Sequence, residues 1–163
     1  MKDNEFLIHM LPQDMEINTT EILVLGSGIA GLFTAIKLCD KFEVTVLTKR
    51  DIMASSTEHA QGGIAAALNQ DDSPEFHFVD TINAGAELCN SEVVKILTEK
   101  GPECVRELIE LGVEFDKRQG SLDFAKEAAH SRRRILHAKG DATGLEIERT
   151  LVAAVRKRNI IIK

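Results

Sequence analysis

The sequence of 163 residues contains no tryptophan and no tyrosine, so seven phenylalanines supply all of its aromatic rings. Proteins that bind single-stranded nucleic acid stack bases on aromatic rings within basic grooves, whereas this chain carries a net charge of −6. It also lacks any apolar run close to the ~20 residues of a membrane helix. We therefore expect no nucleic acid and no membrane among its partners, and a place in the cytoplasm.

Cysteine is scarce as well, since Cys39, Cys89 and Cys104 are odd in number and far apart. Disulfide frameworks and metal sites use closely spaced sets of cysteine, so we expect no disulfide and no metal site. The apolar neighbours of these residues in helical patterns predict buried free thiols instead.

The first 20 residues show no clear period. They lack the basic start and the long apolar core of a signal peptide. We expect residues 1–20 to form a loose N-terminal leader, and residues 21–163 are enough for one domain with a sizeable core.

The clearest pattern runs from Glu21 to Arg50. An apolar strand pattern at residues 22–25 breaks into a G-x-G-x-x-G spacing, a helical pattern follows, and residues 44–47 return to a strand pattern. In such a turn the glycines allow a sharp exit from the strand, a close approach of a pyrophosphate and tight packing of helix on strand. The helix start favours the negative charge of a phosphate. The pattern predicts a dinucleotide site formed by Gly26, Ser27, Gly28, Ile29, Ala30 and Gly31.

The acidic residue that holds the ribose in many such sites, about 20 residues further on, is missing. Thr48 and Lys49 stand at the end of the second strand, and Asp51 falls in the loop. An ordinary NAD dehydrogenase is therefore disfavoured, which leaves open a flavin enzyme with a different ribose contact.

A second informative segment runs from Ser55 to Gly63, ahead of an apolar run at residues 64–68 that predicts a short helix. It combines three hydroxyls with paired glycines, which suits a planar or anionic ligand. The same composition also marks a polar loop that ends in a helix cap, and the residues alone leave both interpretations open.

The rest of the chain is mainly helical in pattern. Helices are predicted from Pro74 to about Ala86, from a Ser91 cap to Gly101, and from Pro102 to Gly112. Short strands are predicted over 113–116 and 122–125, a helix with the capping box Thr143–Glu146 follows, and the run 160–162 predicts a buried strand. Three parallel strands make half of a doubly wound sheet, whose first strand keeps an unpaired edge.

The run from Glu127 to His137 combines an acid, two histidines and three arginines. Its spacing is not that of a standard metal site. The arginines suit a phosphate, a carboxylate or a solvated face, and Glu127 suits an active-site carboxylate, but spacing does not choose among these roles.

Four stretches together resemble the N-terminal part of the L-aspartate oxidase family, within the succinate dehydrogenase and fumarate reductase flavoprotein superfamily. They are residues 22–32, 56–66, 84–89 and 130–138 with 141–144. The glycine fingerprint is generic, whereas A-Q-G-G-I-A-A combined with H-S-R-R-R-I-L-H-A is specific. The resemblance implies an α/β, Rossmann-like FAD-binding domain, in which a parallel sheet carries a helical insertion and is incomplete at the C-terminus. It also implies that the family's capping and C-terminal helical domains are absent.

The resemblance further implies noncovalent FAD, because relatives with covalent FAD carry a histidine where this chain has Ser56. Residues 27–30 would hold the pyrophosphate, and Lys49, next to Thr48, would take the place of the ribose acid. The residues implied to line the flavin are Ser56, Thr57, Glu58, His59, Ala60, Gln61, Gly62 and Gly63.

The family oxidises L-aspartate to iminoaspartate, with hydride transfer to flavin N5 and electrons passing to oxygen or fumarate, in de novo NAD biosynthesis. This implies coupling to quinolinate synthase. Glu127 corresponds to the family's substrate-orienting glutamate, although Ala128-Ala129 replace the two glycines that follow it in the family. The family's catalytic arginine and substrate-gripping histidines lie beyond residue 163, so this chain alone is expected to be inactive. A noncovalent fumarate reductase or succinate-oxidising flavoprotein, and a degenerate non-catalytic flavin-binding module, are the alternatives.

Overall fold

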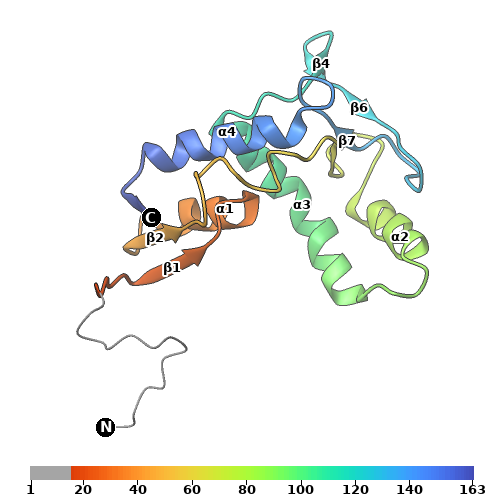
Figure 1. Cartoon of the computed structure of the whole chain (residues 1–163). Coiled ribbons are helices and arrows are strands. Elements are labelled where there is room, and N and C mark those ends of the chain that lie inside the picture. The colour runs from red at the N-terminus through yellow and green to blue at the C-terminus, as the bar shows by residue number, and fades with distance from the viewer. Residues whose placement is uncertain (1–15) are drawn as a thin grey trace.

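The computed structural model describes residues 16–163 and contains a three-stranded parallel sheet at one end (Figure 1). The predicted leader lies largely outside the described residues. The strands are β1 (Ile22–Leu25), β2 (Val44–Leu47) and β8 (Ile160–Ile162), in the order β1-β2-β8. All three are rich in aliphatic residues, which pack well on a pleated surface. The parallel sheet of an α/β fold is therefore confirmed.

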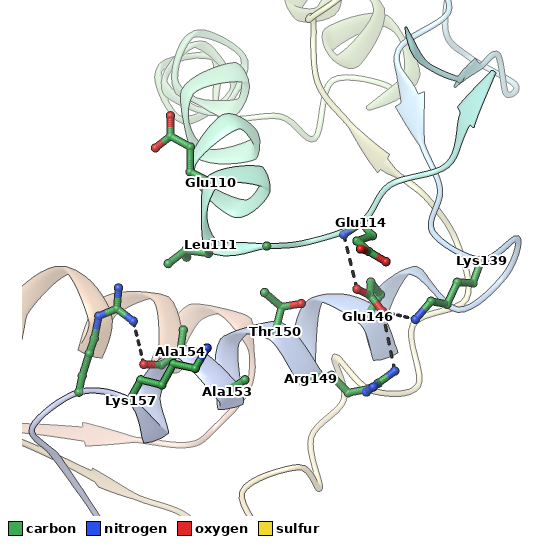
Figure 2. Close-up of a pocket in the computed structure, with 12 residues that line it drawn as sticks. Glu110, Leu111, Glu114, Lys139, Glu146, Arg149, Thr150, Ala153, Ala154 and Lys157 are labelled. Carbon is green, nitrogen blue, oxygen red and sulfur yellow. Dashed lines mark hydrogen bonds and ion pairs between the residues drawn. The ribbon is translucent and has the colours of Figure 1, made fainter. Parts of the chain in front are cut away.

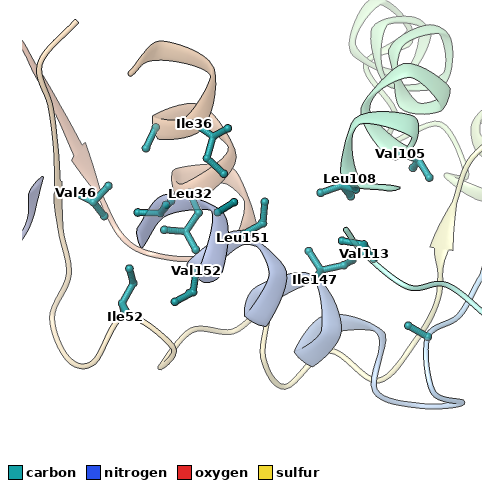
Figure 3. Close-up of a cluster of buried hydrophobic side chains, with 14 of the residues drawn as sticks. Leu32, Ile36, Val46, Ile52, Val105, Leu108, Val113, Ile147, Leu151 and Val152 are labelled. Atoms are coloured by element: carbon teal, nitrogen blue, oxygen red, sulfur yellow. The ribbon is translucent and has the colours of Figure 1, made fainter. Parts of the chain in front are cut away.

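Two helices cover one face of this sheet, α1 (Ile29–Leu38) and α4 (Thr143–Arg156). Figure 3 shows the core between them, where Leu32 and Ile36 of α1 meet Leu151 and Val152 of α4 beside Val46 of β2. Burial of each such side chain contributes about 1.5–3 kcal/mol. This shared core holds the end of β1 and the start of α1 in place.

Among the described residues, the β1 end of the opposite face of the sheet is exposed. Leu23 and Leu25 of β1 are exposed, and within residues 16–163 β1 pairs with β2 alone. The alternation along β1 follows the period of two of a strand with one covered face.

A second, smaller layer is made of short antiparallel strands. These are β3 (Ile64–Ala65), β7 (Ile135–Leu136) and β6 (Phe124–Ala125), beside a hairpin of β4 (Lys117–Arg118) and β5 (Ser121–Leu122). The helix predicted over 64–68 is wrong, because Ile64 pairs with Leu136 and the Ala66 N–H donates to the Arg134 carbonyl at 3.0 Å. Pairing with a strand that lies far along the chain overrides local propensity.

The strands predicted around residue 120 are shifted. Residues 113–116 form no strand, and the hairpin turns at Gln119-Gly120, both of which have positive φ. Asp116 instead donates its N–H to the His137 carbonyl at 2.8 Å. The chain therefore begins its hairpin only after this contact.

The helical insertion contains α2 (Pro74–Ala84) and α3 (Ser91–Leu111), which pack on one another. The predicted break at Gly101-Pro102 is wrong, since α3 is continuous. The residue before a proline is restricted by a clash with its Cβ, and glycine has none. The N-cap of α3 is Asn90 rather than Ser91, because its Oδ1 accepts the N–H groups of Glu92 and Val93.

The predicted capping box of α4 is also wrong. The Thr143 hydroxyl accepts the N–H of Ala138 at 3.1 Å, and the Glu146 carboxylate accepts from Lys139 Nζ at 2.6 Å. Both side chains therefore bind the segment before the helix instead of the N–H groups of its first turn.

All three cysteines are free thiols. Cys39 and Cys89 are partly buried, but Cys104 is exposed because it lines an open cavity. Between residues 16 and 163, every helix is too short or too polar to cross a bilayer.

Candidate cofactor site

The glycine turn between β1 and α1 has the conformation that its sequence predicts. Gly26 has a φ of +101°, in the left-handed region that favours glycine. A Cβ on Gly31 would clash with the carbonyl oxygen of Gly26, so an alanine at this place would push helix and strand apart. The N–H groups of Ala30 and Gly31 donate to no residue in the described part of the chain. They are left for an anion at the helix start.

The end of β2 meets this turn. The hydroxyls of Ser27 and Thr48 lie 3.1 Å apart, and Ser27 is buried. Lys49 follows at the surface and is exposed. The structure therefore brings Thr48 to the turn, with Lys49 exposed next to it.

The segment at residues 55–57 docks directly onto the turn. The Thr57 hydroxyl accepts the N–H of Ile29 at 3.0 Å, and a Cβ on Gly28 would lie 3.2 Å from the same oxygen. The Ser55 hydroxyl in turn accepts the N–H groups of Thr57 and Glu58, at 3.1 and 3.3 Å. Two stretches that are 28 residues apart in the chain thus form one surface.

Gly144, at the start of α4, supports that segment from the other side. Its N–H donates to the Ala60 carbonyl at 2.9 Å, and a Cβ there would clash with the carbonyl oxygen of Thr57. The sequence alone indicates no role for Gly144. The signal was present in the D-A-T-G stretch, but the contact is visible only in the fold.

Further along, Gly63 brings the small sheet to the site. A Cβ on Gly63 would lie 2.7 Å from the Leu136 carbonyl oxygen and 2.9 Å from His137 Nε2. His137 Nε2 lies 3.2 Å from a carboxylate oxygen of Glu127. Glu127, which is about half exposed, is thus placed close to the end of the glycine pair. His137 is the second residue of this site for which the sequence alone indicates no role.

The two alanines after Glu127 differ in backbone conformation. Ala129 has a φ of +69°, whereas Ala128 does not have a positive φ. The left-handed region costs an L-residue roughly 1–2 kcal/mol. The second alanine therefore occupies a conformation in which glycine is favoured.

A cavity of ≈ 480 Å³ opens between the start of α1, the glycine pair and α3. Its lining is mostly apolar and includes Ile29, Ala30, Phe33, Gly63 and Leu108. His77 also lines it, with 4% of its surface exposed and with no hydrogen-bond partner for Nδ1 among the described residues. Burial, together with the charges of Arg134 and His130, lowers the pKa of His77. The ring is therefore neutral at neutral pH.

The arginine run has a structural role at Arg134. This side chain is fully buried and binds Asp72 through two nitrogens at 2.8 Å each, and Asp80 through a third at 2.6 Å. Asp80 also accepts the N–H and the hydroxyl of Ser131, at 2.7 and 2.8 Å. Burial alone would raise the pKa of Asp80, but these donors and Arg134 lower it. The cluster joins the segment after Glu127 to α2.

A second hollow, of ≈ 460 Å³, lies over α4 and the end of α3 (Figure 2). Glu146 lies there between Lys139 and Arg149, at 2.6 and 4.0 Å. The hollow shares no lining residue with the cavity beside Gly63. We assign no cofactor contact to it.

Comparison with known proteins agrees with this geometry. The model of the family described as FAD binding domain matches residues 21–163. An L-aspartate oxidase from Streptomyces coelicolor is 48% identical over 143 residues, covering 86% of this chain and 24% of the relative. One from Nostoc sp. is 46% identical over 138 residues, covering 85% and 24%. The chain therefore spans about a quarter of the length of these relatives, and the resemblance to L-aspartate oxidases is confirmed.

Solved structures show the same fold. Sdh1 of Mycobacterium smegmatis superposes with a TM-score of 0.83 at 30% identity, covering 91% of this chain and 28% of that one. A mutant of FrdA of the E. coli quinol fumarate reductase superposes with a TM-score of 0.82 at 28% identity, covering 88% of this chain and 25% of that one.

Proposed function

Because this chain belongs to the FAD-binding domain family, we propose that residues 26–31, 48–49 and 56–63 together hold one molecule of FAD without a covalent bond. The observation that carries the proposal is the hydrogen bond from the Ile29 N–H to the Thr57 hydroxyl at 3.0 Å. It joins the glycine turn to the hydroxyl segment, so that one extended cofactor can contact both.

The residues present fit this cofactor. Gly28, which has no side chain, and the N–H groups of Ala30 and Gly31, which have no acceptor among residues 16–163, suit a pyrophosphate, with Ser27 and Thr48 beside them. Lys49 replaces the usual acid as the ribose contact. The segment that would line the flavin comprises Ser56, Thr57, Glu58, His59, Ala60, Gln61, Gly62 and Gly63. Ser56 offers no imidazole for a covalent bond. When bound, FAD supplies the capacity to accept a hydride from a substrate.

We extend the proposal to the activity of the whole protein, and we infer that residues 21–163 are the N-terminal part of its FAD-binding domain. Its relatives at 42–50% identity are L-aspartate oxidases, which supports oxidation of L-aspartate to iminoaspartate, with oxygen or fumarate as acceptor. Glu127 orients the substrate, held by His137 at 3.2 Å next to Gly63. Supply of iminoaspartate to quinolinate synthase in the cytoplasm is the step that follows.

A second candidate function is reduction of fumarate or oxidation of succinate, favoured by the likeness to Sdh1 and to the quinol fumarate reductase. The intact gene product separates the two, because an aspartate oxidase turns over aspartate faster than succinate. Faster turnover of succinate would support the second function. Turnover of neither, with FAD bound, would indicate a non-catalytic flavin-binding module.

The test of the cofactor site uses the purified chain. We expect added FAD to bind and to remain with the protein through gel filtration, giving a yellow fraction. Denaturation should then release all of the flavin, because no covalent bond holds it. A chain that stays colourless after addition of FAD would contradict the proposal, and flavin that stays attached after denaturation would contradict its noncovalent part.

A further inference from the structure

Glu148 lies in the middle of α4 and is fully buried. Neither of its carboxylate oxygens has a hydrogen-bond partner among residues 16–163. Buried polar groups are nearly always paired, and an unpaired buried charge is costly. The position of this acid therefore needs an explanation that packing does not supply.

Two residues of the segment that docks on the glycine turn, Ser55 and Glu58, act on the pKa of Glu148. Burial raises the pKa of Glu148 to about 7. The nearby Ser55 hydroxyl lowers this pKa, and the charge of Glu58 raises it. Helix α1 packs on α4, but its Lys37 pairs with Glu107 of α3 at 2.8 Å and not with Glu148. Within the described range, no cation pairs with Glu148.

A short chain of contacts joins Glu148 to the glycine turn. The Ser55 hydroxyl, which lowers the pKa of Glu148, accepts the N–H of Thr57 at 3.1 Å. Thr57 accepts the N–H of Ile29 at the helix start, and the Ser55 Cβ would lie 3.8 Å from a Cβ on Gly28. Ser55 and Thr57 thus connect the buried acid to the backbone that would face a pyrophosphate.

We propose that Glu148 takes up a proton from solvent when the pyrophosphate of FAD binds at residues 26–31, and that this positioning residue makes cofactor affinity depend on pH. The inference rests on the proposed cofactor site. Two phosphate charges near a buried carboxylate disfavour its ionised form. The neutral acid leaves the Ser55 segment undisturbed. By thermodynamic linkage, protonation of Glu148 raises the affinity for FAD by the same factor by which bound FAD raises the proton affinity of Glu148. The proton passes from buffer to a carboxylate oxygen, and no other bond changes.

Isothermal titration calorimetry of FAD into the chain, in two buffers of different ionisation enthalpy, measures this uptake. If binding raises the pKa by about one unit, about half a proton enters per FAD near pH 7.5. Affinity then falls about sevenfold between about pH 6 and pH 8.5. Glu148→Gln keeps the size of the side chain and cannot ionise, so its proton uptake should be near zero and its affinity constant over this range.

Glu58→Gln is the second variant, and it remains decisive if Glu148→Gln fails to fold. Loss of the neighbouring charge should move the midpoint of the pH profile to lower pH and leave its amplitude unchanged, whatever its effect on affinity. A midpoint that stays in place overturns the inference. Equal proton uptake by the wild-type chain and Glu148→Gln also overturns it, with the cofactor site intact, whereas absence of any FAD binding overturns the cofactor site itself.

Discussion

The hydroxyl of Thr57 accepts the N–H of Ile29, the first residue of α1, at 3.0 Å. Thr57→Val keeps the shape of the side chain but leaves this N–H without its acceptor. A neutral hydrogen bond contributes about 1 kcal/mol, so we expect FAD affinity to fall about fivefold in fluorescence titrations. Thr57→Ser keeps the hydroxyl and should bind FAD within about twofold of the wild type. Equal affinities of Thr57→Val and Thr57→Ser would show that the contact does not shape the site.

Gly31 allows α1 to lie against the end of β1. In Gly31→Ala the new methyl clashes with the Gly26 carbonyl, and we expect the free energy of unfolding to fall by about 3 kcal/mol. Urea unfolding measures the change. The control is Gly62→Ala, where the methyl meets no atom within 4 Å, so its effect should stay within about 0.5 kcal/mol. Similar losses in both variants would refute the steric explanation.

The left-handed conformation of Ala129 makes a stabilising change available. The free energy of unfolding of Ala129→Gly should be about 1–2 kcal/mol higher than that of the control Ala128→Gly. Both changes add the same freedom to the unfolded chain, so their difference isolates the strain at φ +69°. Thermal unfolding of the two variants measures it, and equal midpoints would argue against a strained backbone after Glu127.

The buried cluster around Arg134 tolerates no removal of its cation. Arg134→Met leaves the carboxylate of Asp72 buried without its partner, which should cost about 3–5 kcal/mol of stability in urea unfolding. The neighbouring Arg133 is exposed and donates to the Phe124 carbonyl, so Arg133→Met should cost less than about 1 kcal/mol. A small effect of Arg134→Met would mean that Asp72 finds another partner.

The free energy of unfolding should fall as the pH rises, because of Glu148. Its pKa rises from 4.5 to about 7 on folding, so its contribution is complete below about pH 4.5 and is lost as the pH rises through 7. The loss is of the order of 3 kcal/mol. Glu148→Gln should therefore be more stable than the wild type near pH 8 and similar to it near pH 4.5. Glu146→Gln, which loses its partner Lys139, should be less stable than the wild type near pH 8.

Much of the sheet could be predicted from the sequence. The apolar runs at β1, β2 and β8, and the glycines between β1 and α1, act through local chemistry: side-chain alternation, and a turn that only glycine adopts easily. The A-Q-G-G-I-A-A stretch pointed to the correct family. The break expected at Pro102 failed because the preceding glycine removed the usual clash.

The environment of a side chain could not be predicted in this way. Nothing in the run Arg132 to Arg134 distinguishes the one arginine that is buried, because its partners Asp72 and Asp80 lie more than 50 residues away. For the same reason α4 read as an amphipathic helix, while the fold placed Glu148 on its buried side.

The sequence by itself determined where the backbone can turn and which strands are apolar enough to form a sheet, since both depend on neighbours in the chain. Only the tertiary structure decided that Thr57 caps Ile29, that His137 approaches Gly63 and that Glu148 is enclosed. These contacts join distant segments, and they exist only once the core between α1, α4 and the sheet has closed.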